Sequence, residues 1–424
     1  MIQKSKLFDF VNKRKVLFSN FFSLSIFQLL NYLVPLLLIP FLIKTVGLEK
    51  FGLIMFVQAF MQYFVIFTDF GFNYIATKEI SKFRDNQILV SEIVNSVYII
   101  KIILLIISFL ILSCLIFSID KLYANYELMY ISFGIVVGQV LFPMWIFQGF
   151  EKMKIMVIIN LIPKILILSL VFFIIKSEAD YLLYALLWSL TFIISGVISI
   201  LYVRKYLYIE FRIEKLSILL KYYNMSKDIF ISNGASSLYL TSNPVILGFV
   251  STENAVAYYT IAEKSVRVIR YVLSPITQAL FPHYSTKFSN QSLSVSVGQI
   301  KSLIFKLSPI IFLVTIGIIV FAKHIVLILS GSVIQNIVVD IYILSLIIIF
   351  GTFNNIIGIL GFINLNMTKE FKKNVIYTGL FSITITTILS IYYDDIGASI
   401  GLVLSETLLL LLLIFDLFLK RKLT

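Results

Sequence analysis

The chain has 424 residues, of which 59% are hydrophobic and 13% charged, and its formal net charge is +13. A soluble domain has roughly 45–50% apolar and about 25% charged residues, so this composition excludes an ordinary water-soluble fold. It indicates a polytopic membrane protein, and its one cysteine, Cys114, excludes an internal disulfide.

Apolar stretches of about 20 residues or more, the length that crosses a bilayer, follow one another along the chain. They predict an all-α integral membrane protein with about twelve transmembrane helices. The predicted helices span residues 18–43, 51–77, 88–117, 124–148, 155–175, 181–203, 229–250, 255–282, 301–322, 334–362, 374–393 and 397–418. The longest connection, residues 204–228, predicts a cytoplasmic linker between a first six-helix lobe, residues 1–203, and a second, residues 229–424.

Basic residues are concentrated in alternate loops. Twenty-four Lys and Arg residues lie in the loops on one side of the predicted membrane and five on the other, and basic loops mark the cytoplasmic side. We therefore expect a multi-pass membrane protein with both termini in the cytoplasm. Its cations would face the anionic lipids of the inner leaflet, which explains the positive charge without a nucleic-acid partner. Three lysines near cytoplasmic helix ends, Lys101, Lys164 and Lys306, are expected to snorkel to the headgroups.

The predicted second helix carries a polar stripe. Gln58, Gln62, Asp69 and Asn73 are separated by 4, 7 and 4 positions, which keeps them on one face of a helix. Such side chains either line a polar cavity or hydrogen-bond between helices. The same two interpretations apply to Asn233 and Asn243 in the predicted seventh helix, to Asn354 and Asn355 in the tenth and to Glu406 in the twelfth.

The predicted eighth helix concentrates charge where lipid would be expected. Four ionisable residues, Glu263, Lys264, Arg267 and Arg270, lie between apolar flanks. At about 100° per residue, Glu263, Arg267 and Arg270 share a face about 60° wide, and Lys264 stands at its edge. A charge facing lipid costs about 2.5–3.5 kcal/mol, so this face must point into protein or into a water-filled cavity.

Two interpretations of the charged face stay open. Its net positive sign favours an anion-binding site, with Arg267, Arg270 and Lys264 as ligands. Alternatively, Glu263 and Arg267 neutralise each other as an interhelical staple.

Motifs of catalysis and metal binding are missing from the sequence. It has two histidines, His283 and His324, and it lacks an HExxH motif, a phosphate-binding glycine loop and a nucleophile elbow. We therefore expect no cofactor and no metal site. A membrane glycosyl-transfer enzyme is the alternative from another class, and the short outer loops argue against it.

Three stretches resemble one family across nearly the whole chain. They are TDFGFNYIATKEISKFR (residues 68–84), FPMWIFQGFEKMK (residues 142–154) and AYYTIAEKSVRVIRYVLSPITQALFPHYS (residues 257–285). They are similar to the Wzx-type oligosaccharide flippases of the multidrug/oligosaccharidyl-lipid/polysaccharide exporter (MOP) superfamily. One departure is Ala257, where the family pattern leads us to expect glycine.

The resemblance implies two six-helix lobes, as in MATE transporters, around a cationic cavity. It implies a transporter, not an enzyme, that moves undecaprenyl-diphosphate-linked oligosaccharide repeat units to the outer leaflet by alternating access, for O-antigen (lipopolysaccharide) or capsule synthesis. Its partners would be this lipid-linked substrate, membrane lipids, and candidate polysaccharide polymerase and chain-length proteins. The alternative within the superfamily is a cation-coupled drug exporter, which would favour unpaired carboxylates over an excess of cations.

Under this interpretation Arg267, Arg270 and Lys264 bind the diphosphate. Coupling to an H⁺ or Na⁺ gradient would need a buried carboxylate that binds the ion differently in the two transport states. The candidates are Glu263, Asp69 and Glu406, and the candidate cavity-lining residues are Gln58, Gln62, Asn73, Asn233 and Asn243.

Overall fold

The computed structural model describes residues 2–207, 209–288, 291–365 and 367–419. Within its helices the side chains of residues 2–26, 28, 32, 232–233, 235–240, 271–279, 281–283, 285–286 and 418–419 lie outside the description. The described residues form helices and short connections, without a strand among them. Contacts divide the chain into two compact units, Met1–Asn31 with Phe60–Gly234, and Tyr32–Ala59 with Ala235–Thr424.

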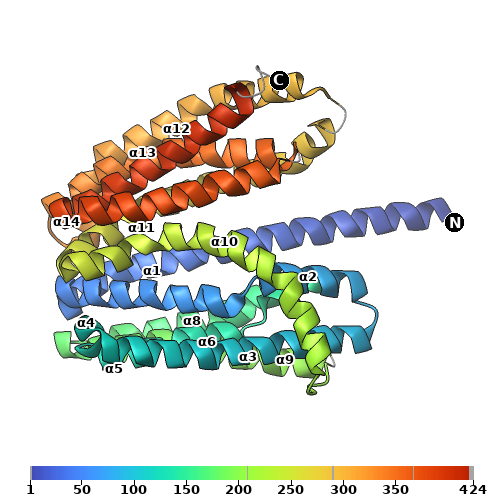
Figure 1. The fold of residues 1–424 in the computed structure, drawn as a ribbon, viewed down its shortest axis with the longest axis horizontal. Coiled ribbons are helices and arrows are strands. Elements are labelled where there is room, and N and C mark those ends of the chain that lie inside the picture. Colours follow the sequence, from blue (N-terminus) through green and yellow to red (C-terminus); the bar gives the residue numbers. More distant parts are fainter. Residues whose placement is uncertain (1, 208, 289–290, 366, 420–424) are drawn as a thin grey trace. The chain divides into compact units, whose positions relative to one another are not determined.

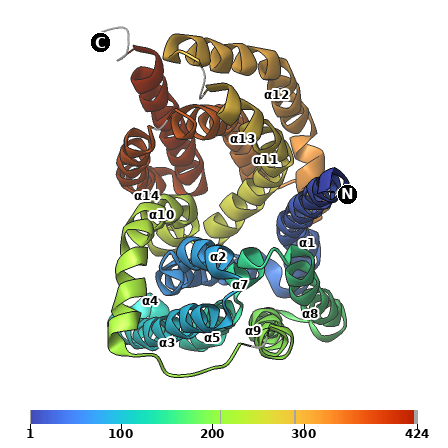
Figure 2. The same cartoon turned by 90° about the vertical axis from the view of Figure 1, so that its right-hand side faces the viewer.

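The first unit is a bundle of helices drawn from the first half of the chain (Figures 1 and 2). Its helices are part of α1 (Ile2–Asp69), α2 (Phe72–Phe83), α3 (Gln87–Ser118), α4 (Asp120–Tyr123), α5 (Tyr126–Ser132), α6 (Gly134–Leu141), α7 (Met144–Gly149), α8 (Met153–Ile174), the 3₁₀ turn Glu178–Asp180, α9 (Tyr181–Tyr206) and part of α10 (Leu216–Val250). Helix α9 packs against α6 and α8, and α2 packs against α7. Trp145, Phe147 and Phe72 are fully buried in the core of this unit.

The second unit contains the remaining helices. They are α11 (Glu253–Phe288), α12 (Leu293–Ser330), α13 (Gln335–Asn355), the π-helix Ile356–Ile363, α14 (Thr368–Ile414) and the π-helix Phe415–Leu419, together with parts of α1 and α10. Helix α13 packs against α11, α12 and α14, and so lies at the centre of the unit. Polar side chains on α11, α13 and α14 can therefore meet inside it.

Eight helical stretches of the described chain are long and apolar enough to cross a membrane. Two of them contain a break in the backbone, at Gly47 in α1 and at Tyr393 and Asp394 in α14. These breaks fall at or beside two of the predicted loops. The eight stretches overlap ten of the twelve predicted segments, and the other two, residues 229–250 and 255–282, lie on the helices α10 and α11. The prediction of an all-α, multi-pass membrane protein is confirmed.

The structure differs from the predicted segments at two helices. The predicted helix 51–77 is interrupted, because Phe70 and Gly71 have positive φ angles of 48° and 78° and α2 begins only at Phe72. A Cβ at Gly71 would lie 3.0 Å from the Ile229 side chain, so the turn also needs a small residue for close packing. The predicted helix 124–148 is divided into α5, α6 and α7, and α6 ends at Leu141 because Pro143 disfavours a helical residue before it.

The predicted linker, residues 204–228, is shorter in the structure. Helix α9 continues to Tyr206 and α10 begins at Leu216, so both helices extend into the predicted connection.

Candidate functional site

The charged face of α11 is present as the helical spacing predicts. Glu263 and Arg267, one turn apart, form an ion pair on this face, with 13% and 28% of their side-chain surfaces exposed. The staple contact therefore exists, but it joins two residues of the same helix and so does not tie α11 to another helix.

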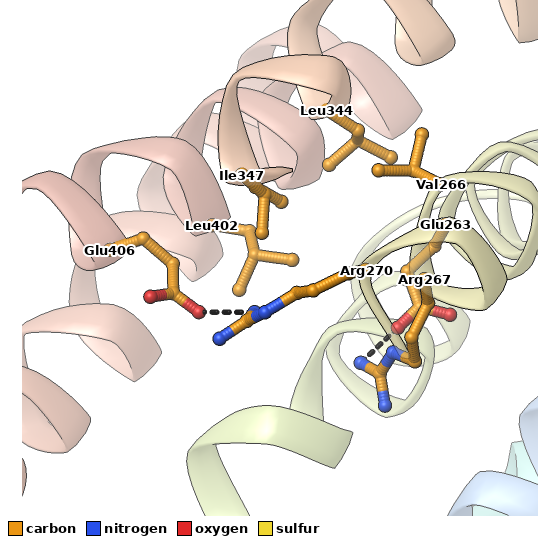
Figure 3. Close-up of a pocket in the computed structure, with 8 residues that line it drawn as sticks. All are labelled: Glu263, Val266, Arg267, Arg270, Leu344, Ile347, Leu402 and Glu406. Atoms are coloured by element: carbon orange, nitrogen blue, oxygen red, sulfur yellow. Dashed lines mark hydrogen bonds and ion pairs between the residues drawn. The ribbon is translucent and has the colours of Figure 1, made fainter. Parts of the chain in front are cut away.

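Arg270 extends from α11 to two other helices (Figure 3). Its Nη1 donates a hydrogen bond of 2.8 Å to Oε1 of Glu406 on α14, and its Nη2 donates one of 3.3 Å to the carbonyl oxygen of Gly351 on α13. The side chain of Glu406 is 2% exposed and that of Arg270 is 21% exposed. The guanidinium thus joins three helices of the second unit at a largely buried position.

Glu406 also accepts hydrogen bonds from Asn354 on α13. The Asn354 Nδ2 lies 2.7 Å from Oε2 of Glu406 and 2.9 Å from its backbone oxygen. Both carboxylate oxygens of Glu406 therefore have a donor, one from Arg270 and one from Asn354. A buried carboxylate needs such partners, because leaving it unpaired costs several kcal/mol.

Gly351 provides the space for the guanidinium. A Cβ built at this position would lie 2.3 Å from Cζ of Arg270 and 2.6 Å from its Nη2. Only glycine lets the side chain of Arg270 lie this close to the backbone of α13.

A small cavity adjoins these charges. Its polar lining is Glu263, Arg267, Arg270 and Glu406, and its apolar lining is Val266, Leu344, Ile347 and Leu402. Its volume is about 20 Å³, which suffices for a water molecule. A diphosphate is much larger than one water, so the cavity in its present form is too small to enclose one.

Lys264 is placed apart from this cavity. It is half-buried on α11 but does not belong to the lining residues, in agreement with its position at the edge of the helical face.

Asp69 forms a further ion pair among the candidate residues, in the first unit. Lys101 Nζ on α3 lies 3.2 Å from Asp69 Oδ1, and 4% of the Lys101 side chain is exposed. Asn73 and Gln139 line the same cavity, whose volume is about 40 Å³. Asp69 and Asn73 are therefore brought together as predicted, although they lie on either side of the helix break at Phe70.

The snorkelling prediction is wrong for two lysines. Lys101 is buried against Asp69, and Lys164 is 5% exposed, donates a 2.7 Å hydrogen bond to Asn31 and lies 5.5 Å from the ring centroid of Trp188. Polar and aromatic partners inside the bundle stabilise these two ammonium groups, so they do not need to reach the lipid headgroups. Lys306 is exposed.

The other candidate cavity residues have different surroundings. Gln62 is half-buried, and Gln58 buries its Nε2 without a hydrogen-bond partner in the described structure. Asn243 is buried and donates to the hydroxyl of Tyr259 at 2.8 Å, which is a contact between helices. The side chain of Asn233 lies outside the described part.

Two buried aspartates were missed by the sequence analysis. Asp340 on α13 is fully buried and accepts a 2.7 Å hydrogen bond from Ser399, and Asp395 on α14 accepts one of 3.3 Å from Asn336. The signal was available, since Asp340 is an acid inside a predicted apolar helix, the same criterion that identified Glu406.

Ion pairs buried inside the helical units of a multi-pass membrane protein are rare and typically mark a functional site. The chain belongs to the polysaccharide biosynthesis protein family, which matches residues 17–288. The chain is 29% identical over 404 residues to a protein of Escherichia coli (strain K12) named "Putative O-antigen transporter", covering 92% of this chain and 94% of the relative. A protein of Shigella dysenteriae with the same name is 31% identical over 258 residues, covering 60% and 64%.

Solved transporter structures share the fold. The inward closed conformation of the lipid II flippase MurJ matches with a TM-score of 0.73 and 14% identity, covering 92% of this chain and 86% of that one. An inward-facing multidrug resistance MATE transporter of the MOP superfamily matches with a TM-score of 0.69 and 15% identity, covering 93% and 96%. The predicted resemblance to a polysaccharide biosynthesis family is confirmed by the family match, and the fold is shared with solved flippase and MATE transporter structures.

Proposed function

We propose that the protein is a flippase that moves undecaprenyl-diphosphate-linked oligosaccharide repeat units from the inner to the outer leaflet of the bacterial plasma membrane, for O-antigen or capsule synthesis. The family, the relatives named for O-antigen transport and the fold shared with a lipid II flippase support this function. The observation that carries it is the guanidinium of Arg270, held inside a helical unit beside a second arginine.

In this proposal Arg270 and Arg267 bind the diphosphate of the substrate. The planar guanidinium donates two parallel hydrogen bonds to phosphate oxygens and stays charged at any physiological pH. The two residues are three positions apart on α11, so a diphosphate can bridge them. Lys264, at the edge of the face, adds positive charge, and the polyprenyl tail stays in the lipid.

Transport would proceed by alternating access, and an H⁺ or Na⁺ gradient is the proposed energy source. Asp69 and Glu263 are the proposed coupling carboxylates, because each is partly buried and pairs with a cation that ion binding could release. Both termini are proposed to lie in the cytoplasm.

Deletion of the gene with measurement of lipid-linked intermediates tests the proposed function. We expect undecaprenyl-diphosphate-linked repeat units to accumulate and surface polysaccharide to be lost, with recovery by the wild-type chain but not by Arg270→Ala at equal protein level. Intact surface polysaccharide together with increased drug sensitivity would instead favour a drug exporter. Loss of the lipid-linked intermediate itself would favour a glycosyl-transfer enzyme.

A further inference from the structure

Glu406 occupies the face of Arg270 that a phosphate would need. The 2.8 Å hydrogen bond joins Nη1 of the guanidinium to a carboxylate oxygen, which has the charge and the geometry of a phosphate oxygen. Gly351 accepts from Nη2, so both outer nitrogens of the fork already have an acceptor. These contacts use two of the five N–H donors of the guanidinium, so an anion that bridges the two outer nitrogens competes with Glu406 for Nη1.

Asn354 keeps the carboxylate of Glu406 in this position. Its Nδ2 donates to Oε2 and to the backbone oxygen of the same residue, and its own Oδ1 has no hydrogen-bond partner among the described residues. Both of these hydrogen bonds end on Glu406 and neither involves Arg270. Asn354 can therefore hold Glu406 while the guanidinium moves away.

We propose that Glu406 is an internal counter-ion that closes the empty anion site and that the diphosphate of the substrate displaces from Arg270. This inference rests on the proposed function for the identity of the anion. In the empty protein the pair of Arg270 and Glu406 is neutral, so the site can reorient without a bound ligand. In the loaded protein Arg270 holds phosphate oxygens, and Glu406 keeps the hydrogen bonds of Asn354.

The exchange determines in which direction a coupled cation would move. Once the diphosphate holds Arg270, the carboxylate of Glu406 has lost its counter-charge, so the loaded state is the one that favours a cation at Glu406. That cation would travel outward with the lipid, whereas an inward H⁺ or Na⁺ gradient drives cations the other way. Glu406 therefore regulates access of the anion to Arg270, and an inward H⁺ or Na⁺ gradient would be coupled to transport through a different carboxylate.

Binding of inorganic pyrophosphate to the purified full-length protein in lipid nanodiscs, measured by calorimetry, tests the counter-ion. Glu406→Gln should bind pyrophosphate roughly tenfold tighter than wild type or better, because a carboxylate that occupies the site about nine-tenths of the time weakens apparent affinity tenfold. The amide of glutamine can still accept from Asn354 but no longer attracts Arg270. Glu406→Asp, which keeps the charge on a shorter stem, should show a smaller gain.

Two controls separate this effect from general electrostatics. Asp340→Asn removes a fully buried carboxylate of the same unit, one bonded to Ser399, and should change the affinity by about twofold or less. The double variant Arg270→Ala with Glu406→Gln should show no gain, since the site that Glu406 covers is then missing. Size-exclusion profiles and thermal unfolding establish that each variant is folded.

The outcomes distinguish the counter-ion from the proposed function. If Arg270→Ala loses binding while Glu406→Gln and Glu406→Asp bind no tighter than wild type, the counter-ion is refuted and the diphosphate site stands. If Arg270→Ala binds as tightly as wild type, the diphosphate site and the counter-ion fall together. Absence of binding by every variant, Glu406→Gln included, would also overturn the counter-ion.

Discussion

Gly351→Ala should displace Arg270 from Glu406 without altering either charged residue. The added Cβ would lie 2.3 Å from Cζ of Arg270 and 2.7 Å from its Nε, far inside van der Waals contact. The guanidinium ends a flexible side chain, so it is expected to swing away and leave the backbone of α13 in place. The cost of the substitution is then the loss of the ion pair and of the bond to the Gly351 carbonyl.

The size of this effect follows from burial. Breaking a buried ion pair costs about 3–5 kcal/mol, since the remaining charge has neither water nor a partner. Glu406 keeps Asn354, and about a fifth of the Arg270 side chain is exposed and can hydrate. We therefore expect the free energy of unfolding to fall by about 3 kcal/mol, the lower end of this range. The better helix propensity of alanine should offset roughly 0.5–1 kcal/mol of this loss.

Thermal unfolding of the purified protein and surface polysaccharide at equal protein level measure the result. Gly317→Ala in α12 is the matched control, because a Cβ there meets no atom within 4 Å, and it should be neutral or slightly stabilising. Adding Arg270→Ala and Glu406→Gln to Gly351→Ala should recover stability but not transport. A Gly351→Ala protein with wild-type stability and output would refute the role given to this glycine.

Three further predictions concern single contacts and the topology. Lys101→Met should destabilise the protein by about 3 kcal/mol, the lower end of the cost of breaking a buried pair, because Asp69 is left unpaired but is a quarter exposed. Lys101→Met with Asp69→Asn should recover most of this loss, and additive losses in thermal unfolding would contradict the pairing. Arg270→Lys should restore only part of the surface polysaccharide lost in Arg270→Ala, because the charge survives but the two-pronged donor does not; full recovery would show that charge alone suffices. Reporter fusions at Asp228 and Thr424 should be cytoplasmic and one at Glu253 external, and an external reporter at either of the first two would contradict the topology.

Local helical geometry could be predicted from the sequence. The face that carries Glu263, Arg267 and Arg270 depends only on the helical period, and the structure has these three residues lining one cavity. The helical segments likewise follow from apolar length, because a chain in lipid must satisfy its backbone hydrogen bonds within each segment. The break after Asp69 was not predicted, since it depends on Gly71 packing against Ile229 more than 150 residues away.

Pairing between distant helices could not be predicted. Arg270 and Glu406 are 136 positions apart, and Lys101 and Asp69 are 32 apart, so neither contact has a signature in local spacing. The snorkelling prediction relied on the general rule that a lysine in a transmembrane helix reaches the headgroups, but Lys101 lies near the middle of α3. Burial of the Lys101 ammonium is favourable because Asp69 lies beside α3 and pairs with it.

Charge counting on one helix identified three residues that line the cavity but did not pair Arg270 with Glu406. Within residues 263–270 of α11 there are three cations and one acid, which suggested a site that attracts anions by net charge. The lining of the cavity instead contains two arginines and two glutamates, so its formal charges balance. A balanced site cannot select an anion by its overall field. It can select an anion by exchange, in which a diphosphate takes the place of Glu406 on Arg270. A diphosphate offers more oxygens to the guanidinium than one carboxylate does. Selectivity for the anion then depends on how strongly Asn354 and Gly351 stabilise the ion pair of Arg270 and Glu406.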